Sequence, residues 1–165
     1  MESNFPINID IEKQPTDCTC GPTCLHAVYR YFESDVVLDS VIEGVRALED
    51  GGTLGVFLGL NALSRNYSAQ IYSYNLSTFD PSWGGLTSEE LIQKLREQAK
   101  HKAAKKFQLK SKAYIEFLSR GGKLSFQQLS VELLQRYFSC GIPILTGLSA
   151  TYLYGSKREY TDKNL

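Results

Sequence analysis

Cys20 is the residue of this 165-residue chain that is best placed for covalent chemistry. Gly21 and Pro22 follow it, and the apolar residues after them recur at helical spacing, which predicts a buried amphipathic helix from about residue 21 to residue 33. Pro22 suits the first helical turn, where its missing N–H costs nothing. A thiol at this place faces unpaired backbone N–H groups and the positive end of the helix dipole, which both favour the thiolate. The sequence therefore predicts that Cys20 is a nucleophile.

Gln14 lies six residues before Cys20, and its side-chain amide can donate to an oxyanion. The pattern of Gln, five residues, Cys-Gly-x-x-Cys-Leu and an apolar helix ending in aromatics resembles the nucleophile motif of bacterial papain-like cysteine peptidases. Within that superfamily it is similar to the bacteriocin-processing, double-glycine leader peptidases. Thr19 stands where these peptidases usually have an acidic residue. The resemblance implies a hydrolase that needs no cofactor, in which Gln14 helps form the oxyanion hole and Cys20 attacks a peptide or amide carbonyl.

The other cysteines allow different interpretations. A buried cysteine usually acts as an inert small hydrophobe, and we expect this of Cys24, on the helix, and of Cys140, at a helix end. Cys18, Cys20 and Cys24 could instead bind a metal ion. A structural zinc site needs four ligands, usually in paired short Cys or His spacings, and the chain has no second pair. The sequence thus favours a nucleophile over a metal site, and no metal is expected.

Two histidines are the candidates for the base that a cysteine nucleophile needs. His26 follows Cys20 by six residues, so it lies about 9 Å further along the same helix and points to a different face. We expect it to be a hydrogen-bonded helix residue. His101 lies within a lysine-rich run and is expected to be exposed. In the papain-like fold the catalytic His is carried by a strand that follows the one expected here at 142–148, which would place it beyond this chain.

Three classes of function therefore stay open. The first is a cysteine peptidase or amidase that is truncated before its catalytic His. The second is a catalytically inactive peptidase-like domain that binds peptides or a partner protein. The third is a small structural or interaction domain whose motif matches by accident.

The elements before and after the nucleophile helix must position it. An extended arm or short strand at 4–13, with alternating isoleucines, would bring Gln14 to the thiol. Ser40 and Glu43 form the pattern of a capping box for a second helix, which is expected to stop at Gly51 and Gly52. Thr53 can cap a third helix, which is apolar nearly all round and should therefore pack against the nucleophile helix among other partners.

Two strands, at 69–75 and 142–148, are predicted to belong to the sheet. The expected fold class is α+β, a papain-like fold in which the nucleophile helix packs on an antiparallel sheet whose last part is missing. We expect one domain, 1–165, that contains a helical insertion at 76–122.

The segment 76–122 differs in character from the rest of the chain. Thr87 and Glu90 form a second capping-box pattern for a long helix, and six lysines between residues 100 and 112 predict a solvated face or, alternatively, a surface that attracts an acidic peptide. Trp83 is expected to pack under a turn-rich loop. A short helix near residues 114–118 and a further helix at 130–140, with Val131, Leu134 and Phe138 inward, complete the prediction.

Composition limits the partners. Hydrophobic residues make up 42% of the chain, which is ample for one core, and the 18 basic residues balance the 18 acidic ones. A net charge of zero gives no reason to expect nucleic acid or an anionic membrane as a partner. Neither a signal-peptide pattern nor a membrane-spanning run is present, so a cytoplasmic protein with reduced thiols is expected.

Overall fold

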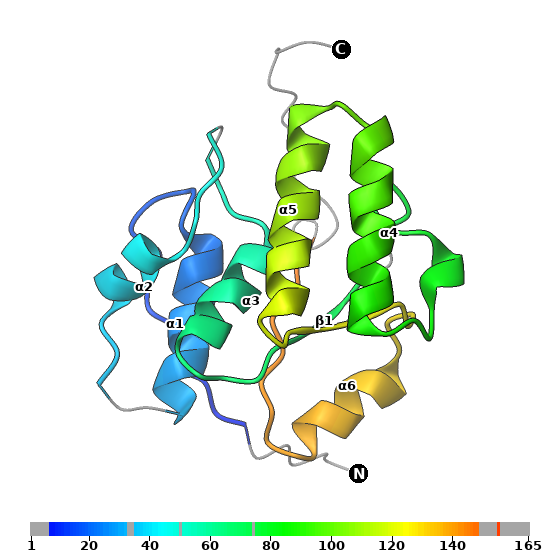
Figure 1. Ribbon diagram of the computed structural model, residues 1–165. Helices are drawn as coiled ribbons and strands as arrows, with labels where there is room; N and C mark the ends of the chain where they lie inside the picture. The colour runs from blue at the N-terminus through cyan, green and yellow to red at the C-terminus, as the bar shows by residue number, and fades with distance from the viewer. Residues whose placement is uncertain (1–6, 33–34, 50, 74, 149–154, 156–165) are drawn as a thin grey trace.

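The computed structural model describes residues 7–32, 35–49, 51–73, 75–148 and 155. In this part of the chain the fold is mixed, mostly helical, with a sheet of two short strands (Figure 1). The elements in order are α1 Cys20–Phe32, α2 Leu38–Gly44, α3 Gly55–Ser64, β1 Gln70–Tyr72, the 3₁₀ helix η1 Pro81–Trp83, α4 Ser88–His101, α5 Lys105–Ser119, β2 Lys123–Ser125 and α6 Val131–Phe138.

Helix α1 begins at Cys20, one residue before the expected start, and the prediction of a buried amphipathic helix directly at the thiol is confirmed. Its inner face packs with α2, α3 and α5 around one hydrophobic core. The Tyr29 hydroxyl donates a hydrogen bond of 2.8 Å to the Asn61 side chain on α3, and both groups are buried. The buried apolar members of this core are Leu25, Tyr29, Val41, Val45, Val56, Phe57, Leu60, Ala113 and Phe117.

Helix α3 is buried on two sides, as its apolar composition predicts. One side faces α1 in the core just described, and the other faces α5. A Cβ at Gly59 would come within 2.8 Å of the Phe117 ring, so the two helices can approach this closely only because residue 59 has no side chain. The helix ends at Ser64, and Asn66 then adopts a positive φ of 65°.

The expected caps of α2 and α3 are wrong. Helix α2 begins before Ser40, whose hydroxyl lies inside the first turn and donates to the Val37 carbonyl. The helix also ends at Gly44, well before the two glycines expected to stop it. Thr53 does not cap α3, because its hydroxyl donates to the Arg46 carbonyl at 2.8 Å and ties the intervening loop together.

The sheet also differs from the prediction. Strand β1 pairs in parallel with β2, with Gln70 opposite Lys123, whereas an antiparallel sheet containing 142–148 was expected. Residues 142–148 form no strand, and Ile142 and Leu148 are exposed. The β-rich composition of that segment cannot produce a strand without a neighbour to pair with, and the described neighbour of β1 is β2.

Helices α4 and α5 form an antiparallel hairpin that supplies the long crossover a parallel strand pair requires. The capping box at the start of α4 is confirmed, because Thr87 Oγ1 accepts from the Glu90 N–H and Glu90 accepts from the Thr87 N–H. Trp83 is only 8% exposed and packs in a second core under its loop, as predicted. That core contains Phe79, Trp83, Leu91, Leu95 and Leu118.

Helix α5 extends over 15 residues, far longer than the predicted helix at 114–118, and takes part in both cores. Phe117 is fully buried in the first core, and Leu118 is buried in the second. The segment 76–122 therefore contributes directly to the main core.

Helix α6 is capped by Ser130, and Gly141 ends it with a φ of 68°. The predicted inward face is wrong for Val131, which is 64% exposed. Leu133 is buried instead, because the helix is turned so that this neighbouring position faces the protein.

Candidate nucleophile site

Cys20 is the first residue of α1, and its side chain is exposed. The residue before it, Thr19, does not cap the helix in the usual way. Its hydroxyl donates to the Thr16 carbonyl at 2.8 Å and accepts from the Thr16 N–H at 3.1 Å, so it belongs to a turn outside the helix. Thr23 closes the first helical turn through its own N–H and hydroxyl, which both donate to the Thr19 carbonyl.

This turn leaves the start of α1 open. Among the described residues, neither the Cys20 N–H nor the Gly21 N–H has a hydrogen-bond acceptor, and Pro22 has no N–H. The first turn contains no acidic side chain. Two donors and the positive end of a 13-residue helix are therefore available beside an exposed thiol, which is the environment that stabilises an anion.

The loop before α3 fixes the start of α1. A Cβ at Gly21 would lie 2.6 Å from Thr53 Cγ2 and 3.5 Å from the Leu58 methyls, so the backbone next to the thiol packs directly on this loop. Cys18 packs on the same loop, because a Cβ at Gly51 would lie 2.7 Å from its sulfur. Gly51 has a φ of +86°, a conformation that L side chains rarely adopt.

The remaining cysteines differ in exposure. Cys24 is half-buried one turn after Cys20, and burial raises the pKa of its thiol, with the nearby Cys20 adding to the rise. This fits the unreactive role predicted for Cys24. Cys140 is exposed, so the expectation that it is a buried hydrophobe is wrong. It follows the last turn of α6, where its N–H donates to the Tyr137 carbonyl and its side chain faces away from the protein.

Gln14 is half-buried in an extended segment that forms no strand. The arm is held to α1 by an ion pair of 3.2 Å between Glu12 and Arg30, near the end of the helix opposite Cys20. Among the described residues the Gln14 amide makes no hydrogen bond, and none joins it to Cys20. The oxyanion-hole role of Gln14 therefore stays a prediction.

Neither histidine lies in a catalytic arrangement with the thiol. His26 is 1% exposed, and its Nε2 lies 2.8 Å from the Val36 carbonyl, to which it donates, while Nδ1 is buried without a partner among the described residues. The prediction of a hydrogen-bonded helix histidine holds for one ring nitrogen only. His101 is exposed at the end of α4, as expected.

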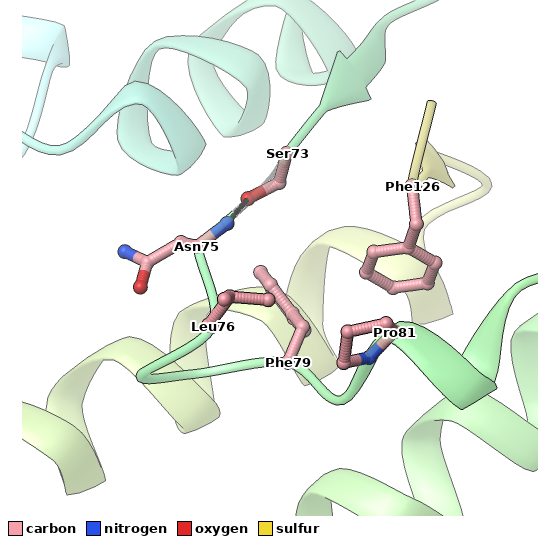
Figure 2. A pocket seen from close by; sticks show the side chains of 6 residues that line it. All are labelled: Ser73, Asn75, Leu76, Phe79, Pro81 and Phe126. Atoms are coloured by element: carbon pink, nitrogen blue, oxygen red, sulfur yellow. Dashed lines mark hydrogen bonds between the residues drawn. The ribbon is translucent and has the colours of Figure 1, made fainter. Parts of the chain in front are cut away.

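A small hollow near the end of the sheet offers no reactive group. It lies between the end of β1 and η1, and Figure 2 shows its lining as mainly apolar side chains, with the Asn75 N–H donating to the Ser73 hydroxyl at 3.3 Å. Its volume of about 20 Å³ is too small for a substrate. The lining residues are Ser73, Asn75, Leu76, Phe79, Pro81 and Phe126.

The described residues contain no group of three or more His, Cys, Asp or Glu side chains arranged to hold a metal ion. They also contain no helix with the length and apolar character needed to cross a membrane. Comparison of the chain with protein-family models, curated proteins and solved structures finds no match.

Sequence reasoning missed the groups that shape the site around Cys20. The turn formed by Thr16 and Thr19 and the packing of Gly21 on Thr53 both lie next to the thiol. The Gly51-Gly52-Thr53 stretch was a usable signal, because two adjacent glycines indicate a backbone that must bend sharply or approach something closely.

Proposed function

We propose that this chain is a cysteine peptidase-like domain in which the Cys20 thiolate attacks peptide or amide carbonyls, with the catalytic base supplied from outside these 165 residues. The observation that carries the proposal is the exposed thiol at the open start of α1. The Cys20 and Gly21 N–H groups have no other described acceptor, so they are available to donate to an oxyanion that forms on the sulfur-bound carbon.

The chemical step follows from this geometry. The sulfur of Cys20 forms a bond to the carbonyl carbon, the carbonyl electrons move to oxygen, and the resulting oxyanion is stabilised by backbone N–H groups and the helix dipole. Collapse of this intermediate expels the leaving group and gives a thioester. An amine leaves only after it accepts a proton, and neither His26 nor His101 is placed to donate one.

The same observation favours a second function. Because the chain places no imidazole beside its thiol, a peptidase-like domain that binds a peptide without cleaving it fits this part of the structure equally. Both functions use the same surface at the start of α1, and they differ in whether an acyl group is transferred to Cys20. The cytoplasmic location stays part of the proposal, because four free thiols are typical of a reducing compartment.

A burst experiment with p-nitrophenyl acetate tests the proposal, since p-nitrophenolate leaves without a proton. The expected result is rapid release of about one equivalent of p-nitrophenolate per chain, with the acetyl group found on Cys20 by peptide mass and slow release afterwards. Cys20→Ser should abolish the burst, and Cys140→Ser, the matched control at another exposed thiol, should retain it.

Added imidazole then separates the two functions. If an external base completes the cycle, imidazole should accelerate deacylation of the acetyl-Cys20 form in a concentration-dependent manner. Acylation that is spread equally over Cys18, Cys20 and Cys140 would refute the nucleophile assignment. Selective acylation of Cys20 without any effect of imidazole would favour the peptide-binding function.

A further inference from the structure

The loop that joins α2 to α3 lies between the start of α1 and helix α5 (Figure 1). It touches the chain on both sides of Cys20, because its Gly51 packs against the Cys18 side chain and its Thr53 packs against Gly21. The backbone that carries the reactive thiol is therefore in contact with one loop both before and after the thiol. We call this segment the α2–α3 loop, and it is described at residues 45–49 and 51–54.

Thr53 closes the α2–α3 loop on itself. Its hydroxyl donates to the Arg46 carbonyl at 2.8 Å, seven residues earlier in the chain. Within the loop, the Leu48 N–H donates to the Gly52 carbonyl and the Gly51 N–H donates to the Leu48 carbonyl, each at 3.0 Å. The hydroxyl and the methyl group of a threonine share one β-carbon, so the hydrogen bond also fixes the direction of the methyl group that packs on α1.

The side chain of Arg46 anchors the α2–α3 loop to α5. Its two terminal nitrogens donate to the two carboxylate oxygens of Glu116 at 2.7 and 2.9 Å. The guanidinium also lies 5.9 Å from the centre of the Phe57 ring on α3. A bidentate pair fixes the direction of both partners as well as their distance. Arg46 thus connects α5, through its side chain, with Thr53, through its carbonyl.

The contact with Gly21 bears on the two N–H groups beside the thiol. A Cβ at Gly21 would lie 2.6 Å from Thr53 Cγ2 and 3.5 Å from the Leu58 methyl groups, so the loop and α3 together cover this residue. The Cys20 and Gly21 N–H groups keep their direction only while the first turn of α1 stays wound, and helix ends fray. Donors stabilise an oxyanion effectively when their direction is fixed before the reaction.

We propose that Thr53 and Arg46 are positioning residues for Cys20, because the loop that they close and anchor holds the Cys20 and Gly21 N–H groups in the direction in which they donate to the oxyanion. This role rests on the proposed attack of Cys20 on a carbonyl and extends it to residues far from the thiol in sequence. Thr53 acts through its packing on Gly21, and Arg46 acts through Thr53. Glu116 on α5 supports both from the other side of the loop.

Two reactions of the same thiol separate positioning from stability. Acetylation by p-nitrophenyl acetate develops an oxyanion and alkylation by iodoacetamide does not, whereas both begin from the thiolate. The ratio of the acetylation rate to the alkylation rate at Cys20, measured by peptide mass, therefore reports the N–H donors. Cys140 gives the reference ratio in the same sample, because it is an exposed thiol whose own N–H donates to the Tyr137 carbonyl. The wild-type ratio should be higher at Cys20, and equal ratios would overturn the positioning role.

Two substitutions of Thr53 test the closure of the loop. Thr53→Val should lower the ratio at Cys20 about ten-fold, because the Arg46 carbonyl loses its donor and the loop opens. Complete removal of an oxyanion donor costs more, about 10²–10³-fold. Thr53→Ser keeps the hydroxyl, and the Leu58 methyl groups still cover Gly21, so it should restore most of the ratio that Thr53→Val loses. Equal losses in the two variants would overturn the role of the hydroxyl.

Arg46→Met and Arg120→Met form a matched pair for the anchor. Each removes one arginine that lies 2.7 Å from the Glu116 carboxylate, and the two side chains are similarly exposed, but only Arg46 belongs to the α2–α3 loop. Arg46→Met should lower the ratio at Cys20 about three-fold, in keeping with the modest strength of a partly exposed ion pair. Arg120→Met should leave the ratio unchanged. Equal losses in the two variants would overturn the role of the anchor.

Cys24 reports whether each variant is folded. Its thiol is half-buried and burial raises its pKa, so it is alkylated slowly while α1 is intact and faster when the helix unfolds. Selective acetylation of Cys20 that a folded Thr53→Val variant leaves unchanged would overturn the positioning role while the proposed function stands. Acetylation of the wild type that is spread equally over the exposed thiols would instead refute the proposed function.

Discussion

Helices α1 and α4 have nearly the same length, 13 and 14 residues, but they begin in different ways. The start of α4 is closed by a capping box, with two acidic residues in its first turn. The start of α1 has no acidic residue there, and its preceding threonine bonds to an outer turn instead. The capping box pairs the Thr87 and Glu90 N–H groups, and the two glutamates place negative charge beside the helix start, which disfavours an anion there. The comparison therefore separates a start built for stability from one available for chemistry.

The largest expected effect concerns the second residue of each helix, Gly21 in α1 and Glu89 in α4. Gly21→Ala should lower the free energy of unfolding by about 1–3 kcal/mol, because the new methyl group would lie 2.6 Å from Thr53 Cγ2. Glu89→Ala loses only an exposed charge near the helix dipole, worth about 0.3–1 kcal/mol. Urea unfolding of both variants measures the two losses in the free energy of unfolding. Equal losses would show that the loop containing Thr53 does not hold α1 in place.

The next effect concerns the two threonines that precede the helices. Thr87→Ala should cost about 1 kcal/mol of stability, because its hydroxyl accepts from the Glu90 N–H. Thr19→Ala should cost less, because the Thr19 hydroxyl bonds to Thr16 and not to a helix N–H. Thermal unfolding of the two variants gives the comparison. A larger loss of stability in Thr19→Ala than in Thr87→Ala would contradict this expectation. It would mean that the turn formed by Thr16 and Thr19 stabilises α1 more than the Thr87 cap stabilises α4.

A smaller effect is expected in thiol reactivity. Cys20 and Cys140 are both exposed, but Cys20 begins a helix and Cys140 follows the end of one. Opposite dipole ends should make iodoacetamide label Cys20 about three- to ten-fold faster than Cys140 at low salt. Peptide mass spectrometry at several time points measures both rates in one sample. High salt should narrow the ratio, and equal rates at low salt would contradict the role given to the helix start.

The smallest effect is a pH dependence confined to α4. The backbone N–H and hydroxyl of Thr87 lower the pKa of Glu90, so its stabilising contribution is complete above the pKa of the unfolded chain. As the pH falls through the lower folded pKa, that contribution is lost. The stability advantage of the wild type over Glu90→Gln should therefore shrink on acidification from neutral pH. Urea midpoints at several pH values test this, and an advantage that grows in acid would reverse the assigned sign.

Local patterns were the part of the fold that sequence could predict. The helix that begins at Cys20 and the capping box at Thr87 follow from residues within one or two turns of each other, and both are confirmed. The burial of Trp83 follows from the cost of leaving a large aromatic side chain in water. Such features need no knowledge of distant partners.

The errors involve partners that are far apart in the sequence. The segment 142–148 has strand composition, but the described partner of β1 is β2, which is too short and polar to stand out. The sequence position of Thr53 predicts a cap for α3, but its hydroxyl donates a hydrogen bond to the Arg46 carbonyl instead. At the site, Cys20 could be singled out from the sequence. The unpaired N–H groups and the positive dipole end at a helix start act on residues of that same helix start, so no distant partner has to be known. The packing of the Thr53 loop on Gly21 could not be predicted, because Gly51 and Gly52 indicate a sharp bend or a close approach but not which segment the loop will approach.

The parallel pairing of β1 with β2 has a consequence for how the chain folds during synthesis. Gln70 leaves the ribosome about fifty residues before its partner Lys123, and closing so long a loop carries a substantial entropic cost. The α4–α5 hairpin forms through local contacts and brings the two strands together as it does so. Until β2 emerges, β1 has no described strand to pair with and offers an open edge to other chains. The nascent protein is therefore most prone to aggregate after β1 is made and before α5 is complete.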